Sequence, residues 1–178
     1  NISVAVNVSA IQVTSKNLIN VIIGAIASAG LSANRLTLEI TESAFLKDTF
    51  TNLATLKRLH ELGVQFAMDD FGTGYSSLGY LMSFPFSTIK IDRSFIAGLP
   101  DQDESRAIVR AIADLARNLK MQVIAEGVET TAQREQVKML GCSEMQGYLF
   151  SMPRAAAEIR RLFLPHAQGT VSIVSQVA

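Results

Sequence analysis

Residues 36–41 read LTLEIT, an alternation of apolar and polar side chains. Successive side chains of a β-strand point to opposite faces, so the leucines and the isoleucine fall on one face and the threonines and the glutamate on the other. The same alternation recurs in three further places, in residues 3–8 (SVAVNV), 66–69 (FAMD) and 88–92 (TIKID). These segments predict strands of a sheet with one apolar face and one polar face.

Strand-like segments alternate along the chain with segments of helical period. Strands are expected at 2–8, 35–41, 64–70, 88–92, 122–128 and 143–150. Helices are expected at 16–29, 48–62, 101–119, 131–140 and 154–164, and three glycines stand where helices should end, at Gly30, Gly63 and Gly141. The segment 70–88 predicts a loop with at most a short helix. This order predicts a parallel sheet with right-handed crossovers.

The polar strand face distinguishes two parallel architectures. An open doubly wound sheet is covered on both faces and needs apolar residues on both. A closed barrel keeps its helices outside and a polar mouth at the carboxyl ends of its strands. We therefore predict an α/β fold, a TIM-like (β/α) barrel with about six of its eight strands in this chain. Two strands are expected to precede Asn1, since six strands leave two open edges.

Composition narrows the class of protein. The chain has 178 residues, 48% of them hydrophobic, with 16 basic and 16 acidic side chains. These values are typical of one soluble globular domain, expected at 1–164, with a tail or linker at 165–178. A balanced charge argues against a DNA or RNA duplex as partner, and no apolar stretch reaches the ~20 residues of a membrane span. Cys142 is the single cysteine, so nothing indicates secretion.

Polar side chains from six predicted strands are expected at the barrel mouth: Asn7, Glu39, Asp69, Asp70, Lys90, Asp92, Glu126 and Gln146. Hard divalent cations such as Mg²⁺ and Mn²⁺ take carboxylate and amide oxygens as ligands. The adjacent Asp69 and Asp70 can present oxygens to two neighbouring metals, which suits phosphodiester cleavage. Lys90 supplies a fixed positive charge for a phosphate or a water.

Each of these residues also has a structural interpretation. Lys90 and Asp92 can pair with charged neighbours, Asn7 can close a turn, and Gln146 can be a core amide. Five acids and a lysine that converge on one mouth are nevertheless costly without a metal or a function. No Ser/His/acid set and no Cys/His pair is apparent for nucleophilic catalysis. Taken together, these residues predict a metal-binding or catalytic site.

At these residues the chain resembles the EAL-domain family of cyclic di-GMP phosphodiesterases. The matching stretches are 6–12 (VNVSAIQ), 38–43 (LEITES), 68–78 (MDDFGTGYSSL), 89–92 (IKID), 124–129 (IAEGVE) and 146–150 (QGYLF). Their order and spacing agree from residue 2 to about residue 164. The resemblance implies a TIM-like barrel that hydrolyses the bacterial second messenger cyclic di-GMP to linear pGpG.

The resemblance also implies a metal-ligand set. Asn7, Glu39 and Asp69 look like ligands of a first Mg²⁺ or Mn²⁺ ion. Asp69 looks like the bridge to a second ion, and Asp70 looks like a ligand of that second ion.

Further roles follow from the same resemblance. Lys90 resembles the lysine that orients the water and the substrate phosphate, and Glu126 resembles the general base or a second-site carboxylate. Gln146 and Asp92 resemble residues that position the water or the substrate. Glu42 resembles the glutamate that fixes the loop 70–77, which includes Gly72, Thr73 and Gly74 and which in this family also shapes the dimer interface.

One departure from the family is large. The namesake Glu-Ala-Leu, whose glutamate is a metal ligand, occurs nowhere in the sequence. We therefore expect this chain alone to be inactive, although its parent domain is expected to be an enzyme. Two rival functions stay open: a catalytically silent module that binds cyclic di-GMP or a protein partner, and a different metal-dependent barrel hydrolase. The resemblance further implies a homodimer in the bacterial cytoplasm, and it leaves open fusion to a sensor or diguanylate cyclase domain and a membrane anchor in the parent.

Overall fold

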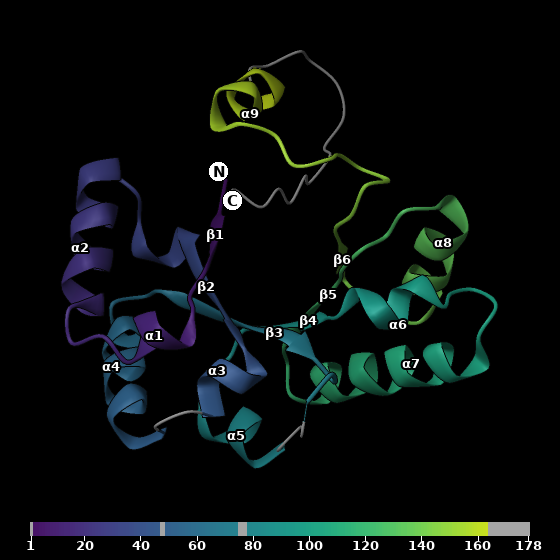
Figure 1. Ribbon diagram of the computed structural model, residues 1–178, viewed down its shortest axis with the longest axis horizontal. Coiled ribbons are helices and arrows are strands. Elements are labelled where there is room, and N and C mark those ends of the chain that lie inside the picture. Colours follow the sequence, from purple (N-terminus) through teal and green to yellow (C-terminus); the bar gives the residue numbers. More distant parts are fainter. Residues whose placement is uncertain (1, 47–48, 75–77, 164–178) are drawn as a thin grey trace.

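A six-stranded sheet forms the centre of the computed structural model, which describes residues 2–46, 49–74 and 78–163. All neighbouring strands are parallel, and their order in the sheet follows their order in the chain. The strands are β1 (Val4–Asn7), β2 (Leu36–Thr41), β3 (Gln65–Phe71), β4 (Thr88–Ile91), β5 (Gln122–Ala125) and β6 (Glu144–Met145). Figure 1 shows them as an arc, which is part of a barrel wall. The predicted parallel α/β arrangement is confirmed.

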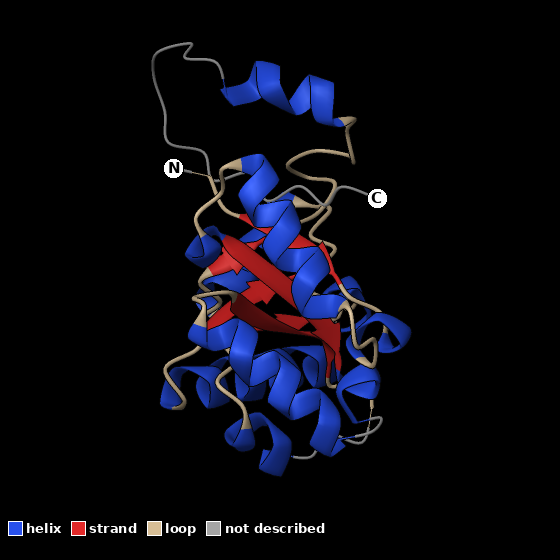
Figure 2. Cartoon of the chain, turned by 90° about the vertical axis from the view of Figure 1, so that its left-hand side faces the viewer, coloured by secondary structure: helices blue, strands red, loops and turns tan. Residues whose placement is uncertain are grey.

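Helices cover the outer side of this arc (Figure 1), and Figure 2 shows the strands enclosed by them. The helices are α1 (Ala10–Val13), α2 (Leu18–Ala29), α3 (Glu42–Leu46), α4 (Thr49–Glu61), α5 (Leu78–Ser83), α6 (Arg93–Ala97), α7 (Asp103–Asn118), α8 (Thr131–Met139) and α9 (Ala156–Phe163), with a 3-10 turn η1 at Ala33–Arg35. Helix α9 lies apart from the others, over the open side of the arc. Among the described residues, every helix is too short or too polar to cross a bilayer.

Local sequence signals fix several helix ends. Ser9 and Gln12 form a capping box at α1, and Thr130 and Gln133 form one at α8. In such a box each side chain bonds the other's backbone amide, which satisfies donors that a helix start leaves free. All three glycines predicted at helix ends adopt positive φ, just after α2, α4 and α8. Glycine takes this left-handed conformation without a steric penalty.

The apolar face of the sheet makes the core. Leu38, Ile40, Phe66 and Ile89 are buried there under the outer helices. The prediction that alternate strand residues face the helices is therefore confirmed for the central strands. At β1 it is wrong in part: Val4 and Val6 are 42% and 44% exposed, because β1 is an edge strand with a neighbour on one side only among the described strands.

The largest error in the predicted elements concerns the last strand. A strand was expected at 143–150, but β6 ends at Met145. Gln146 N still donates to Ala125 O of β5, but Gln146 O accepts from Val128 N and Leu149 N donates to Val128 O, so the backbone leaves the sheet beyond Gln146. Helices α1, α3 and α6 were not predicted, since each has only four or five residues and shows no full helical period. The predicted tail at 165–178 lies outside the described residues.

Candidate metal and catalytic site

Lys90 is the centre of a buried charge cluster on the inner face of the sheet. Its Nζ lies 2.7 Å from Glu39 Oε2, 2.7 Å from Glu126 Oε1 and 3.0 Å from Asp69 Oδ1. The Lys90 side chain is 0% exposed, and the three acids are nearly as buried. One cation therefore faces three carboxylates in a space from which water is largely excluded.

Strand alternation explains why these four side chains meet. Glu39 and Lys90 occupy the polar positions of β2 and β4, between apolar residues that point the opposite way into the core. Asp69 stands near the carboxyl end of β3, where it is paired in register with Thr41. Glu126 directly follows β5. The carboxyl ends of parallel strands share one edge of a sheet, so the polar residues there converge.

The cluster shifts the pKa values of both Lys90 and Glu126 upward. Burial alone would lower the pKa of Lys90, but the attraction of Glu126, Glu39 and Asp69 outweighs it and raises that pKa above its usual value. Burial raises the pKa of Glu126 to about 7; Lys90 opposes this shift, whereas Asp69 and Glu39 add to it. One lysine shared among three acids does not offset the desolvation of Glu126. The carboxyl group of Glu126 can therefore exchange a proton near neutral pH.

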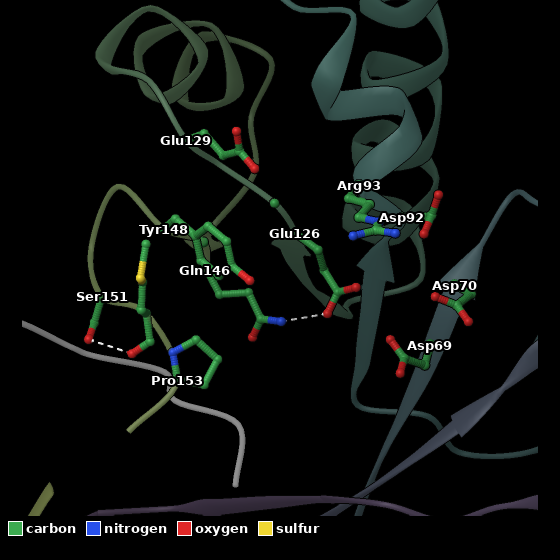
Figure 3. A pocket seen from close by; sticks show the side chains of 13 residues that line it. Asp69, Asp70, Asp92, Arg93, Glu126, Glu129, Gln146, Tyr148, Ser151 and Pro153 are labelled. Carbon is green, nitrogen blue, oxygen red and sulfur yellow. Dashed lines mark hydrogen bonds between the residues drawn. The ribbon is translucent and has the colours of Figure 1, made fainter. Parts of the chain in front are cut away.

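Gln146 fixes the orientation of Glu126. Its Nε2 donates to Glu126 Oε1 at 2.6 Å, the same oxygen that faces Lys90 (Figure 3). Within the described part of the chain, both polar contacts of Glu126 thus fall on Oε1 and leave Oε2 available. The Oε1 atom of Gln146 is buried and has no hydrogen-bond partner among the described residues. A buried acceptor without a donor is costly, and a bound cation or ligand would satisfy it.

Asp69, Asp70 and Glu126 form a group that fits a divalent cation. One carboxylate oxygen from each lies within 4.8 Å of the other two. Consecutive strand residues normally face opposite sides, but the register of β3 against β4 shifts between Met68 and Phe71, and Asp70 has φ 51°. This break lets Asp70 line the same pocket as Asp69.

Electrostatics support that fit. Burial raises the pKa of Asp70 above its ordinary value, and the neighbouring charges of Asp69 and Asp92 raise it further. Carboxylates held this close repel one another unless protons or cations neutralise them. Oxygen ligands of this kind are those that Mg²⁺, Mn²⁺ and Ca²⁺ prefer.

A pocket of about 350 Å³ opens beside the acids. Figure 3 shows its two walls, with Asp69, Asp70, Asp92 and Arg93 on one side and Gln146, Tyr148, Ser151 and Pro153 on the other. Asp92 also caps α6, because its carboxylate accepts from Ser94 N at 3.0 Å. The hydrogen bonds from Ser94 outweigh the effect of burial and lower the pKa of Asp92. Asp92 is therefore both a helix cap and a wall of the pocket.

The predicted loop-stabilising residues lie beside the cluster. Glu42 begins α3 and is buried, and a Cβ on Gly74 would stand 3.3 Å from Glu42 Oε2. Thr73 donates through its hydroxyl to Asp70 O at 2.8 Å. Gly72 has φ 96°, and a Cβ added there would stand 3.1 Å from the ring of Phe95. The loop after Asp70 thus passes beside Glu42 at Gly74; residues 75–77 lie outside the described part.

The structure brings together most of the predicted site residues. Glu39, Asp69, Glu126 and Gln146 gather around Lys90, and Asp70 and Asp92 line the adjoining pocket. Asn7 ends β1 and is paired in register with Glu39, but its side chain is exposed and forms no hydrogen bond with the other described site residues.

Eight residues that line the pocket were not predicted as site residues: Arg93, Gly127, Glu129, Gly147, Tyr148, Ser151, Met152 and Pro153. The position of Arg93, directly after the predicted strand 88–92, was a usable signal. The other wall residues lie in irregular segments, which periodicity does not mark.

Comparison with known proteins gives one family. The EAL domain family model matches residues 1–153. MucR of Pseudomonas aeruginosa, a bifunctional diguanylate cyclase/cyclic di-GMP phosphodiesterase, is 43% identical over 157 residues, which are 88% of this chain and 23% of MucR. The chain spans about a fifth of the length of the curated relatives it matches.

Solved structures agree with this assignment. The phosphodiesterase of MucR in complex with cyclic di-GMP superposes with a TM-score of 0.83, over 88% of this chain and 64% of that one. The EAL domain of Mycobacterium smegmatis DcpA gives 0.85 at 42% identity, over 91% and 73%. BlrP1 of Klebsiella pneumoniae, solved with manganese and cyclic di-GMP, gives 0.79 at 28% identity, over 84% and 38%. A calcium complex of BlrP1 with cyclic di-GMP gives 0.78 over the same shares.

Proposed function

The chain belongs to the EAL domain family, and from this premise we propose that its site hydrolyses cyclic di-GMP to linear pGpG with bound divalent metal. The observation that carries the proposal is the group formed by Asp69, Asp70 and Glu126, whose oxygens lie within 4.8 Å of one another at the wall of the pocket. Relatives named as cyclic di-GMP phosphodiesterases, and the cyclic di-GMP complexes of MucR and BlrP1, support the choice of substrate.

The proposed metal ligands are oxygen donors. Asp69, Asp70 and Glu126 would hold one or two Mg²⁺ or Mn²⁺ ions, with Glu39 and Asn7 on the neighbouring strands as further ligands. When bound, such ions would supply positive charge at the phosphodiester and lower the pKa of water. The manganese and calcium complexes of BlrP1 support this class of cation.

The remaining cluster residues hold the acids in place. Lys90 is fully buried, so we assign it to orienting Glu39, Asp69 and Glu126 rather than to direct contact with the phosphate. Gln146 bonds the same oxygen of Glu126 as Lys90 and keeps the other oxygen toward the pocket. In the metal-free protein Glu126, with a pKa of about 7, can accept a proton at neutral pH. Asp92, on the same wall as Asp69 and Asp70, is proposed to position substrate or water.

The loop of Gly72, Thr73 and Gly74 is proposed to set the geometry of Asp70 and to take part in a homodimer. The position of Glu42 beside Gly74 supports this role, because a movement of the loop at Gly74 would also move Asp70. Light scattering tests the oligomer: a mass of two chains is expected, and a strictly monomeric protein at high concentration contradicts it.

Two measurements on the 178-residue chain test the proposed function. Calorimetric titration with cyclic di-GMP in Ca²⁺ should give saturable binding that Asp69→Asn abolishes and the exposed control Asp101→Asn retains. Chromatography of products in Mn²⁺, with MucR as the positive control, then reports hydrolysis to pGpG. No turnover by this chain alone is expected, because the sequence contains no Glu-Ala-Leu, and turnover as fast as that of MucR would refute that expectation. No binding of cyclic di-GMP at all would contradict the proposal.

A further inference from the structure

Arg93 is the only cation among the described residues that line the pocket. Five carboxylates line the same pocket: Asp69, Asp70, Asp92, Glu126 and Glu129. Lys90 lies behind them and is 0% exposed, with three acids around its ammonium group. A ligand in the pocket can therefore reach one side-chain cation of the described wall, the guanidinium of Arg93.

The backbone holds Arg93 firmly against this wall. Arg93 is the first residue of α6 and follows the helix cap Asp92. A Cβ added to Gly127 would stand 2.6 Å from the Cβ of Arg93, so the loop after β5 lies directly on the arginine stem. Gly127 has φ 72°, which favours glycine at this contact. In Figure 3 the Arg93 side chain lies between Asp92 and Glu126, at the edge of the pocket.

Within the described residues the guanidinium of Arg93 forms no ion pair and no side-chain hydrogen bond, and its charge helps to lower the pKa of the neighbouring Asp92. By contrast, Arg106, Arg117 and Arg134 each pair with a carboxylate on the protein surface. Arginine presents five donors in a planar fork that matches the oxygens of a phosphate. The position of Arg93 therefore leaves a complete phosphate-binding group directed at the pocket.

We propose that Arg93 binds the phosphate of cyclic di-GMP that is not cleaved. The inference rests on the proposed function and assigns a substrate-binding residue to it. The cyclic dinucleotide carries two phosphates, and the acids of the Asp69 group would place divalent cations at only one of them. The positive charge of Lys90 is neutralised by the carboxylates of Glu39, Asp69 and Glu126. The second phosphate then has Arg93 as its counter-charge.

Affinity measurements test this assignment without relying on turnover. In Ca²⁺, Arg93→Gln should weaken cyclic di-GMP binding by about 10- to 100-fold, the loss expected for a charged hydrogen-bonded contact. Arg93→Lys, which keeps the charge but not the fork, should fall between Arg93→Gln and wild type. Arg110→Gln is the matched control, because Arg110 is an exposed arginine of α7 outside the pocket and should bind as wild type does.

An analogue of cyclic di-GMP with one uncharged methylphosphonate identifies the atoms that Arg93 contacts. Wild type should lose about as much affinity for it as Arg93→Gln loses for cyclic di-GMP, and Arg93→Gln should lose little more, because the two changes remove one interaction. Fully additive losses, or equal binding by wild type and Arg93→Gln, would overturn the assignment of Arg93. Failure of the wild-type chain to bind cyclic di-GMP would overturn the proposed function itself, and the inference with it.

Discussion

The Lys90 ammonium and Glu126 Oε1 lie 2.7 Å apart, yet the pKa of Glu126 rises to about 7 instead of falling. An isolated ion pair lowers the pKa of its acid. Here the same lysine also faces Glu39 and Asp69, and burial removes the water that would otherwise solvate all three acids. The cluster therefore has an excess of negative charge that protons or metal ions must neutralise.

Removal of the central cation should destabilise the fold. Lys90→Met leaves three carboxylates buried without a counter-ion, and we expect the free energy of unfolding at neutral pH to fall by about 3 kcal/mol or more. Urea denaturation in EDTA measures it. The control Arg117→Met breaks an exposed pair with Asp114 and should change stability by no more than about 1 kcal/mol. A loss below about 1 kcal/mol for Lys90→Met would contradict the account of the cluster.

The raised pKa of Glu126 predicts a pH dependence for the metal-free protein. The folded state holds a proton on Glu126 up to about pH 7, whereas the unfolded chain releases it near the ordinary value of 4.5. Stability should therefore decrease as the pH rises from 4.5 to 7, by about 3 kcal/mol at most, at about 1.4 kcal/mol for each pH unit. Glu126→Gln should flatten this slope, and Glu135→Gln at the exposed surface should leave it intact. Stability that rises over this range in wild type would show that the shift has the opposite sign.

Divalent cations should stabilise the folded chain. Binding to the native state alone raises the free energy of unfolding, by about 2.7 kcal/mol at a metal concentration one hundred times the Kd. Thermal denaturation with increasing Mn²⁺ should show a rising Tm in wild type and in Asp101→Asn. Asp69→Asn and Asp70→Asn each remove a proposed ligand, so their Tm should respond weakly. An equal response of all four proteins would place the metal elsewhere.

Two glycines provide a matched pair of substitutions. Gly127→Ala places a Cβ 2.6 Å from Arg93 in a backbone with φ 72°, and we expect it to cost about 2 kcal/mol. The same change should reduce cyclic di-GMP binding, since it displaces Glu126 and Arg93 together. Gly24→Ala lies inside α2 with nothing within 4 Å of the new Cβ, and it should stabilise the chain by about 0.5–1 kcal/mol. Equal stabilities for the two variants would refute the close packing at Gly127.

Strand alternation was sufficient to predict much of this structure. The polar positions Glu39 and Lys90 in strands of alternating apolar and polar residues predicted both side chains on the inner face, where they form an ion pair. The adjacent Asp69 and Asp70 marked the end of β3. The sequence did not reveal the left-handed backbone at Asp70, because this conformation depends on the register of β3 against β4.

Other features depended on tertiary contacts that no local pattern encodes. β6 ends at Met145, and residues 146 and 149 then form backbone hydrogen bonds with Val128. The alternation of side chains along residues 143–150 does not reveal these bonds. The contact of Gly127 with Arg93 joins segments more than thirty positions apart. The sequence likewise predicted Asn7 as a ligand, but its contacts depend on what faces the exposed edge of β1.

Anomalous diffraction from crystals soaked in Mn²⁺ tests the central claim most directly. We predict a manganese peak within bonding distance, about 2.0–2.6 Å, of carboxylate oxygens from Asp69, Asp70 and Glu126. The peak should disappear in Asp69→Asn crystals grown and soaked in the same way. Manganese bound only at other acids, or no ordered manganese at a concentration that raises the Tm, would contradict the proposed metal site.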